Sequence, residues 1–327
     1  MRLLKFHGTQ WWWGVALGLI FAGVTYGQDE TLRISTDLVR IPLSVTNKKG
    51  EYIAGLHKED FRIFENGVEQ DVELFESELQ PVSIVLLMGS SGSMYEHIPR
   101  LVDAANSFVG QLRGEDQILA ATFGSDVRVL VKMTKVSEFP HGTEIHPSFS
   151  VFGTKVYDAV DDGLKRLKKL PGRKALILFS TGIDIASTSS LKKNISTAEK
   201  QAVTIYTIRF TPRAGSSDAS DLGWFPGING DRSKKKKSDG AAQLAETYMQ
   251  SLAAATGGRS LEIDSLENLD ESFSLVSAEL SRQYTLGYYP KTAGKDGETR
   301  QLMVTFKLPD HIVHARKEVI FADRADR

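Results

Sequence analysis

Hydrophobic and polar positions alternate along residues 31–78, in short runs such as Leu38 to Thr46. Such alternation places apolar side chains on one face of a strand, so the pattern predicts half-buried β-strands. The dipeptide Asn66-Gly67 separates two of these runs and favours the positive φ angles of a tight hairpin turn. We therefore expect a small β unit over residues 28–80.

The pattern changes at Pro81, after which nearly continuous apolar runs recur. These runs predict parallel strands buried on both faces, and they span residues 83–88, 118–123, 175–179 and 203–208. Between them apolar residues recur at helical spacing, as in Leu101, Ala105 and Phe108. Because parallel strands need crossover connections, the alternation indicates an α/β fold with an open, doubly wound, mostly parallel sheet over residues 81–283.

Three further segments complete the expected order. Residues 126–135 follow the second apolar run after only a short turn, so they predict an antiparallel edge strand. Residues 211–240 are polar and rich in Gly, Ser, Asp and Lys, which predicts a flexible insertion before a helix from Ala241 to Ala255. The alternating β texture returns over residues 284–327. This last segment either pairs with residues 28–80 in one sheet or sandwich, or forms a separate β appendage.

Composition excludes several kinds of site. Forty Lys and Arg against forty-one Asp and Glu give a net charge of -1, so no global field favours nucleic acid or an anionic membrane. The 327 residues contain no cysteine, which excludes disulfides, thiol chemistry and Cys-ligated zinc. No glycine-rich phosphate-binding motif follows a strand. We therefore expect neither nucleic acid nor a small-molecule cofactor as a partner.

The N-terminal residues have the pattern of a targeting segment. Arg2 and Lys5 precede an apolar stretch from Trp11 to Val24, and small residues follow up to Gly27. We expect a signal peptide over residues 1–27, and hence an exported protein that is periplasmic or secreted. The alternative is an uncleaved N-terminal membrane anchor, because the three tryptophans suit a membrane interface.

Candidate site residues follow the apolar runs, because ligands of an open α/β sheet gather at the carboxyl ends of its parallel strands. Three segments stand out there: Met88–Met94, Gly153-Thr154 and Ser180–Asp184. Their hydroxyl and carboxylate oxygens are donors that hard divalent cations prefer. In this order the three segments resemble the metal-ion-dependent adhesion site of von Willebrand factor A (VWFA) domains.

The resemblance extends beyond the α/β segment. Gly55-Leu56, Asp60-Phe61 and Glu65-Asn66-Gly67 precede that segment, and Tyr284–Pro290 follows it. With these pieces the chain resembles a VWFA-related family typical of Acidobacteria, over most of residues 30–321. The resemblance implies a VWFA-like domain with a role in adhesion or assembly.

The resemblance also implies a metal site, whose two carboxylates are missing here. The family's site combines Asp-x-Ser-x-Ser with a distant threonine and a further aspartate. Ser91, Ser93 and Thr154 match the hydroxyl ligands, whereas Gly89 and Thr181 stand where the carboxylates belong. The implied ion is Mg²⁺. Neutral hydroxyls compensate poorly for dehydrating Mg²⁺, so metal dependence does not follow from the resemblance.

Asp184 lies three residues beyond Thr181 and is the first candidate for a replacement carboxylate ligand. Asp126, after the second apolar run, is more remote. The alternative is that Ser91 and Ser93 cap the following helix or shape a tight turn, as serine commonly does at such junctions. In that case the fold persists while metal-dependent recognition is lost or altered.

A hydrolase interpretation rests on the same strand end. The segment Gly89–Ser93 resembles the Gly-x-Ser-x-Gly nucleophile elbow, but its last glycine is absent. After an acid such as Asp184, only His311 and His314 follow late enough to complete a triad, and both lie in alternating β texture. We therefore expect no enzymatic activity.

The sequence as a whole favours an exported, non-enzymatic binding or adhesion module. We expect it to recognise a protein or peptide partner through the strand-end face of a VWFA-like domain, and to meet a membrane only if the leader stays uncleaved. The alternative is a structural or scaffold protein in which this site is silent and the β segments make the contacts.

Overall fold

The computed structural model describes residues 38–49, 51–76, 81–90, 98–140, 154–212, 232–295 and 297–321. These residues form three sheets, of which the largest belongs to the α/β portion of the chain. The predicted signal peptide over residues 1–27 lies outside them.

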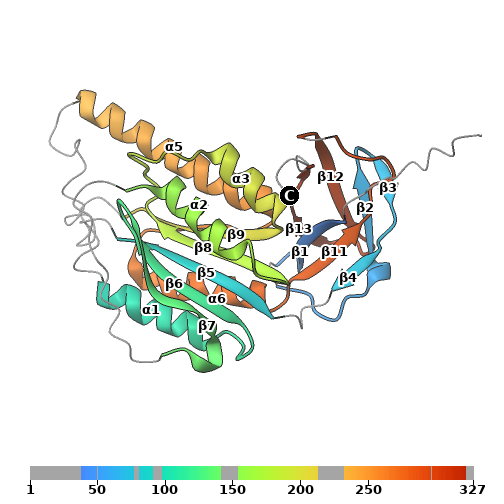
Figure 1. The fold of residues 1–327 in the computed structure, drawn as a ribbon, viewed down its shortest axis with the longest axis horizontal. Coiled ribbons are helices and arrows are strands. Elements are labelled where there is room, and N and C mark those ends of the chain that lie inside the picture. The colour runs from blue at the N-terminus through green and yellow to red at the C-terminus, as the bar shows by residue number, and fades with distance from the viewer. Residues whose placement is uncertain are drawn as a thin grey trace, which may run out of the picture. The chain divides into compact units, whose positions relative to one another are not determined.

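Six of the described strands form the sheet of the α/β portion, in the order β10-β9-β8-β5-β6-β7 (Figure 1). Their bounds are β5 Val82–Gly89, β6 Gln117–Phe123, β7 Val127–Lys135, β8 Arg173–Ser180, β9 Val203–Phe210 and β10 Ser260–Ile263. Neighbouring strands pair in parallel except β6 and β7, which are antiparallel. The predicted mostly parallel α/β sheet and its antiparallel edge strand are therefore confirmed.

Helices cover both faces of this sheet (Figure 1). Helices α1 (Ile98–Gly110) and α6 (Leu269–Leu280) share one hydrophobic cluster with the sheet, and α2 (Val156–Leu167), α3 (Leu191–Lys200) and α5 (Arg232–Thr256) share the other. Successive residues of β5 serve the two clusters in turn, because side chains alternate between the faces of a strand. The 3-10 helices η1 Lys58–Asp60, η3 Val136–Glu138 and η4 Leu266–Asn268 lie in connections.

Helix α2 approaches the sheet closely at Gly163. A Cβ atom at this position would lie 2.7 Å from Cδ1 of Leu176 on β8, and 3.3 Å from Leu87 and Val85 on β5. The absence of a side chain therefore lets α2 pack against the two central strands whose carboxyl ends carry the predicted site.

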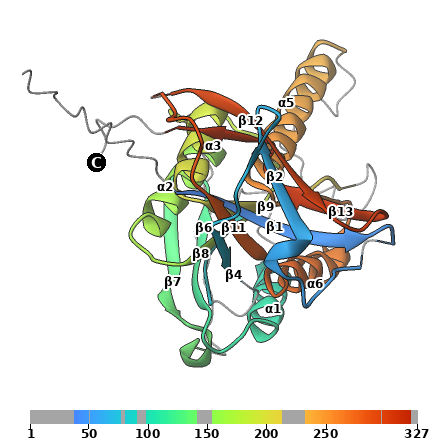
Figure 2. The same cartoon turned by 90° about the vertical axis from the view of Figure 1, so that its right-hand side faces the viewer.

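Strands from before and after the α/β portion share the two smaller sheets, with orders β13-β1-β11-β4 and β14-β12-β2-β3. Their bounds are β1 Val39–Asn47, β2 Phe61–Glu65, β3 Val68–Gln70, β4 Leu74–Glu76, β11 Tyr284–Tyr288, β12 Thr299–Phe306, β13 His311–Ala315 and β14 Glu318–Ile320. Figure 2 shows β1, β2, β12 and β13. The α/β portion is inserted in the sequence between β4 and β11, two strands that pair with each other.

Both smaller sheets contribute to one hydrophobic cluster, which includes Ile41, Leu43, Ile63 and Leu286. An ion pair is buried beside it. Arg300 donates to Glu65 at 2.6 Å, with side-chain exposures of 6% and 4%, and the Tyr288 hydroxyl donates to the other oxygen of Glu65 at 2.6 Å. The hairpin between β2 and β3 turns at Asn66-Gly67 with φ of 46° and 80°, as predicted.

The structure differs from the expected elements in two places. Helix α5 begins at Arg232, whereas the pattern predicted a loop through residue 240. Lysines favour helix, but Lys234–Lys237 have no apolar partners at helical spacing, so the periodicity gave no signal there. Residues 213–231 of the predicted insertion lie outside the described part of the chain. Strands β13 and β14 were not expected as separate elements, because their short alternating runs merge with the preceding texture.

Candidate functional site

The candidate site lies at the carboxyl ends of β5, β6 and β8. Ser91 and Ser93 fall outside the described residues, because the described segment that contains β5 ends at Ser90. Ser90 is buried, and both its N–H and its hydroxyl donate to the carbonyl of Phe123 at the end of β6, at 2.8 and 3.1 Å. The ends of β5 and β6 are thus fastened together directly before the serines.

Thr154 lies between β6 and the loop that follows β8. Its side chain is buried, and its carbonyl accepts the N–H of Ile185 at 2.9 Å. The next residue, Lys155, donates its N–H to the carbonyl of Gly124 at 2.9 Å. The structure therefore brings the predicted threonine beside the segment that carries Asp184.

The carboxylate of Asp184 caps the amino end of α2. One oxygen accepts the N–H of Tyr157 at 3.2 Å and the Ser187 hydroxyl at 2.5 Å, and the other accepts the N–H of Ser187 at 3.1 Å. A negative charge at a helix amino end is stabilised by the unpaired N–H groups and by the helix dipole. Burial, together with this charge, raises the pKa of Tyr157.

A second carboxylate makes the reciprocal contact. Asp158, in the first turn of α2, accepts the N–H groups of Thr188 at 3.0 Å and Ser189 at 2.8 Å, while its own N–H donates to the Ser187 hydroxyl at 3.1 Å. Although partial burial opposes the shift, the N–H groups of Ser189 and Thr188 hold the pKa of Asp158 below its ordinary value. The loop and α2 therefore fasten each other in place.

The described residues of this edge do not fit a divalent cation. Gly89 and Thr181 supply no carboxylate, and both oxygens of Asp184 already accept hydrogen bonds. A Cβ atom on Gly89 would lie 3.2 Å from Oγ of Ser180, so β5 and β8 leave little room there. No group of three or more His, Asp or Glu side chains placed to hold a metal occurs among the residues that the structure describes.

Exposed apolar side chains flank the same edge. Ile185, next to the capping carboxylate, is 62% exposed, and Leu244 on α5 is 69% exposed. The loop after β8 contacts α5 at Gly182, whose φ is 79°. A Cβ atom on this glycine would lie 3.1 Å from Ala245 and 2.6 Å from Met249, so the close contact requires glycine. A fixed loop thus presents an isoleucine to solvent, and the helix that contacts this loop presents a leucine.

The histidines of the hydrolase interpretation lie elsewhere in the fold. His311 and His314 belong to β13, which pairs with β1 in a smaller sheet. His314 shares a hydrogen bond of 2.9 Å with Thr46, and its described contacts do not include Asp184. The structure therefore does not bring these triad candidates together at the strand ends.

A buried polar network joins the α/β portion to the smaller sheets, and sequence reasoning missed it. Glu279 on α6 accepts the hydroxyls of Ser44 and Tyr52, and Arg259 lies 3.2 Å from it. Burial, the charge of Glu279 and its hydrogen bond raise the pKa of Tyr52. The alternating pattern assigns Ser44 to a solvent-facing position, so only the tertiary contact identifies its role.

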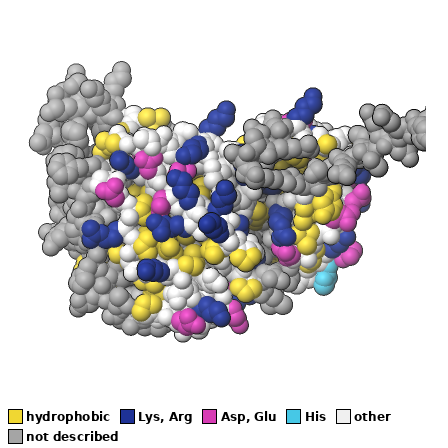
Figure 3. Space-filling model, in the orientation of Figure 1, with side chains coloured by type: hydrophobic (Ala, Val, Ile, Leu, Met, Phe, Trp, Pro, Cys, Tyr) yellow, Lys and Arg dark blue, Asp and Glu magenta, His cyan; other side chains and the backbone are white. Residues whose placement is uncertain are grey.

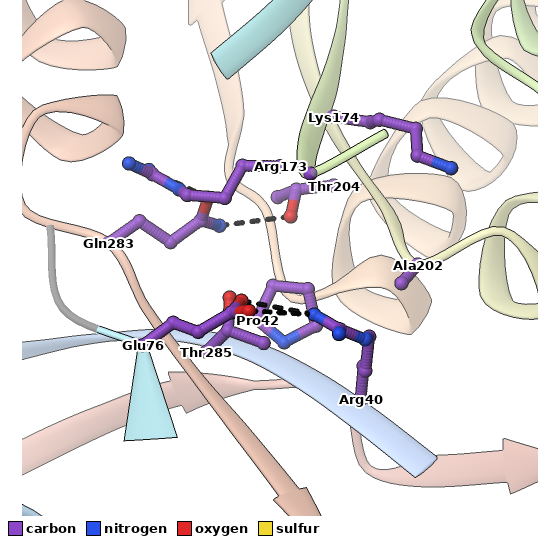
Figure 4. Close-up of a pocket in the computed structure, with 10 residues that line it drawn as sticks. Arg40, Pro42, Glu76, Arg173, Lys174, Ala202, Thr204, Gln283 and Thr285 are labelled. Atoms are coloured by element: carbon purple, nitrogen blue, oxygen red, sulfur yellow. Dashed lines mark hydrogen bonds and ion pairs between the residues drawn. The ribbon is translucent and has the colours of Figure 1, made fainter. Parts of the chain in front are cut away.

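A pocket with a cavity volume of about 20 Å³ is lined by residues of both the α/β portion and the smaller sheets. Figure 4 shows Arg40 paired with Glu76, and Gln283 bonded to Thr204. Arg173 is buried beside them and donates to the carbonyl of Leu280 at 2.5 Å. The volume suits about one water molecule, and the lining is rich in positive charge.

The sequence matches no family model, and no curated protein matches it. Solved structures similar to the chain include a von Willebrand factor type A protein from Catenulispora acidiphila, at 11% identity over 89% of this chain and 76% of that one, with a TM-score of 0.45. The VWA2 paralog of ArnB from Sulfolobus acidocaldarius is similar at 12% identity over 87% and 76%, with a TM-score of 0.44.

A third similar structure is the open form of the pilus adhesin SpaC from Lactobacillus rhamnosus GG, at 9% identity over 83% of this chain and 49% of that one, with a TM-score of 0.43. The α/β assignment rests on the strand order and pairing of the chain itself. Among the described residues, no helix is long and apolar enough to cross a membrane.

Proposed function

We propose that this chain is an exported, non-enzymatic binding module that recognises a protein or peptide partner through the carboxyl edge of its α/β sheet. The observation that supports the proposal most directly is the exposed Ile185 on a loop fastened by Asp184 and Asp158. Apolar side chains held in a fixed position lose little conformational entropy on binding, so they favour association.

The proposed recognition does not depend on a metal ion. A cation would need carboxylates where Gly89 and Thr181 stand, and the hydrogen bonds of Asp184 fix the loop without one. Contact through Ile185 and Leu244 would bury apolar area, which stabilises a complex without a metal ion that both partners coordinate.

Site-specific photo-crosslinking of the full chain in the producing cell tests the proposal. A benzophenone amino acid replaces Ile185 or Leu244 at the proposed surface, or one of two exposed control residues, Leu275 on α6 and Met303 on β12. We expect discrete protein adducts from positions 185 and 244 and none from Leu275. Adducts from Met303 alone support the scaffold role instead, and no adduct at 185 or 244 contradicts the proposal.

A further inference from the structure

Helices α2 and α3 and the turn after α2 carry a concentration of positive charge. We call the exposed cations here the basic face: Lys165, Arg166, Lys168, Lys169, Lys192, Lys193 and Lys200. Between Lys155 and Lys200 the chain has ten basic and five acidic residues, although its overall charge is -1. Figure 3 shows Lys and Arg side chains gathered over the region of α2 and α3. The near-zero net charge therefore conceals a strong local asymmetry.

Acidic side chains neutralise only part of the basic face. Asp161 lies 2.9 Å from Lys165 and 3.1 Å from Lys193, and Asp162 pairs with Arg166 at 2.5 Å. The other four cations have no carboxylate partner within 4.0 Å among the described residues: Lys168, Lys169, Lys192 and Lys200. Asp158 and Asp184, two half-buried acids nearby, accept the N–H groups described above. The face thus keeps an excess of positive charge.

The positive charge continues into the pocket of Figure 4. Gly172, three residues after Lys169, lines that pocket together with Arg40 and Lys174. Burial, followed by the charge of Arg40, lowers the pKa of Lys174, and a nearby anion would favour the charged form of this lysine.

The composition of the face selects the kind of anion. Six of its seven exposed cations are lysines, which are strongly hydrated point charges, and one is an arginine able to form a planar bidentate contact. The described residues of α2 and α3 include no exposed aromatic side chain on which unpaired bases could stack. Lysines without aromatic platforms suit mobile phosphate headgroups, to which they add attraction without fixed geometry.

We propose that the basic face binds the surface of a bilayer that contains anionic phospholipids. The N-terminal targeting segment that the sequence predicts would bring the chain to a membrane during export, so such a surface is within its reach. The basic face comprises other residues than the proposed partner surface at Ile185 and Leu244. The two surfaces share no residue, so separate variants can test them.

Vesicle sedimentation with the full chain tests this proposal. The vesicles are phosphatidylcholine alone or phosphatidylcholine with about one-third phosphatidylglycerol, at about 50 mM and about 300 mM salt. We expect at least about tenfold tighter binding to the anionic vesicles at the lower salt concentration, and loss of most of this preference at the higher one. The preference, and not binding as such, is the readout, because the apolar leader can bind both kinds of vesicle.

Two charge-reversed variants locate the binding surface. Lys168→Glu combined with Lys192→Glu changes the basic face. Lys49→Glu combined with Lys58→Glu makes the same change of net charge on exposed residues of the connections between β1 and β2. We expect the first pair to lose about tenfold in preference for anionic vesicles and the second to lose less than about twofold. Circular dichroism checks that both variants fold.

Three results would overturn the proposal: equal binding to both kinds of vesicle, equal losses in the two variants, or competition by short duplex DNA at an equal phosphate concentration. The last result would identify a nucleic acid, not a bilayer, as the partner. The crosslinking result at Ile185 is independent of all three, so failure here leaves the proposed partner surface untouched.

Discussion

The carboxylate of Asp184 accepts the backbone N–H of Tyr157, at 3.2 Å, and so closes the amino end of α2 with a side chain from the loop after β8. Lys155, the residue that precedes α2, supplies no side-chain cap of its own. A distant aspartate therefore performs the capping that a local serine or aspartate usually performs. The geometry at the sheet edge depends on this contact.

Asp184→Asn should destabilise the protein by about 1–2 kcal/mol, because the amide cannot accept all three hydrogen bonds and carries no charge at the helix end. Urea unfolding measures the change. Asp126→Asn is the control, since its described contact is with the neighbouring Ser125. Equal stability of the two variants would contradict a capping role for Asp184.

Calorimetric titration of the full chain with Mg²⁺ or Mn²⁺ should give no binding heat at about millimolar ion, because Gly89 and Thr181 supply no carboxylate and both oxygens of Asp184 already accept hydrogen bonds. Thr154→Ala is the matched variant. Heat that the wild type produces and this variant lacks would show that the serines and the threonine hold a cation without aspartates.

Removal of the arginine from the buried Arg300–Glu65 pair should destabilise the protein by about 3–5 kcal/mol, because Arg300→Met leaves a carboxylate buried without compensation. The double variant with Glu65→Gln should recover part of this loss. Arg62→Met is the control, since Arg62 and Glu69 are exposed and 3.9 Å apart. It should change stability by less than about 0.5 kcal/mol. Urea unfolding of all four proteins decides the outcome.

Glu199 on α3 makes the stability depend on pH. The residue is 6% exposed, and burial raises the pKa of its carboxyl to about 7, although the charge of Arg316 opposes the shift. Between its ordinary pKa of 4.5 and about 7 the folded protein binds more protons than the unfolded chain, so stability falls as the pH rises through this window.

Glu199→Gln should remove about 2 kcal/mol of the stability difference between about pH 5 and about pH 8, because the amide does not titrate. Urea unfolding of the wild type and the variant at both pH values measures it. An unchanged difference in the variant would assign the pH dependence to another group.

Gly163→Ala should not give the gain of about 1 kcal/mol that alanine normally brings to a helix interior, because the new Cβ atom would meet Leu176 at 2.7 Å. Gly240→Ala on α5 is the matched control, since nothing lies within 4 Å of its Cβ position. Thermal unfolding should show a higher Tm for Gly240→Ala than for Gly163→Ala. The reverse order would mean that α2 does not pack closely at Gly163.

The α/β sheet was predictable because its signals are local. Uninterrupted apolar runs identify β5, β6, β8 and β9. The turn before Val127 is too short for a crossover connection, so β7 had to pair with β6 in antiparallel orientation. The Asn66-Gly67 turn was predictable for the same reason, since two adjacent residues set it. Periodicity failed where its signal is weak, as at the lysine-rich start of α5.

The contacts at the candidate site were less accessible to sequence reasoning. The order of strands predicts that Thr154 and Asp184 lie at one edge, but a linear pattern contains no sign that Asp184 would cap α2. Ser44 and Glu65 have the same difficulty. Alternation assigns Ser44 to a polar outward position, and it puts Glu65 on the apolar face of β2 without showing what compensates its charge, whereas long-range packing buries both. Their roles depend on partners more than two hundred positions away.

The insertion of the α/β portion between β4 and β11 also sets an order of folding. Strand β1 pairs with β11 across about 250 residues of chain, so its partner leaves the ribosome late in synthesis. Contacts of such high sequence separation form slowly, because loop closure precedes their stabilisation. Strands β1 to β4 must wait with open edges while the intervening portion folds and brings β4 and β11 together. Any substitution that delays that portion, even far from these strands, therefore prolongs their exposure to aggregation.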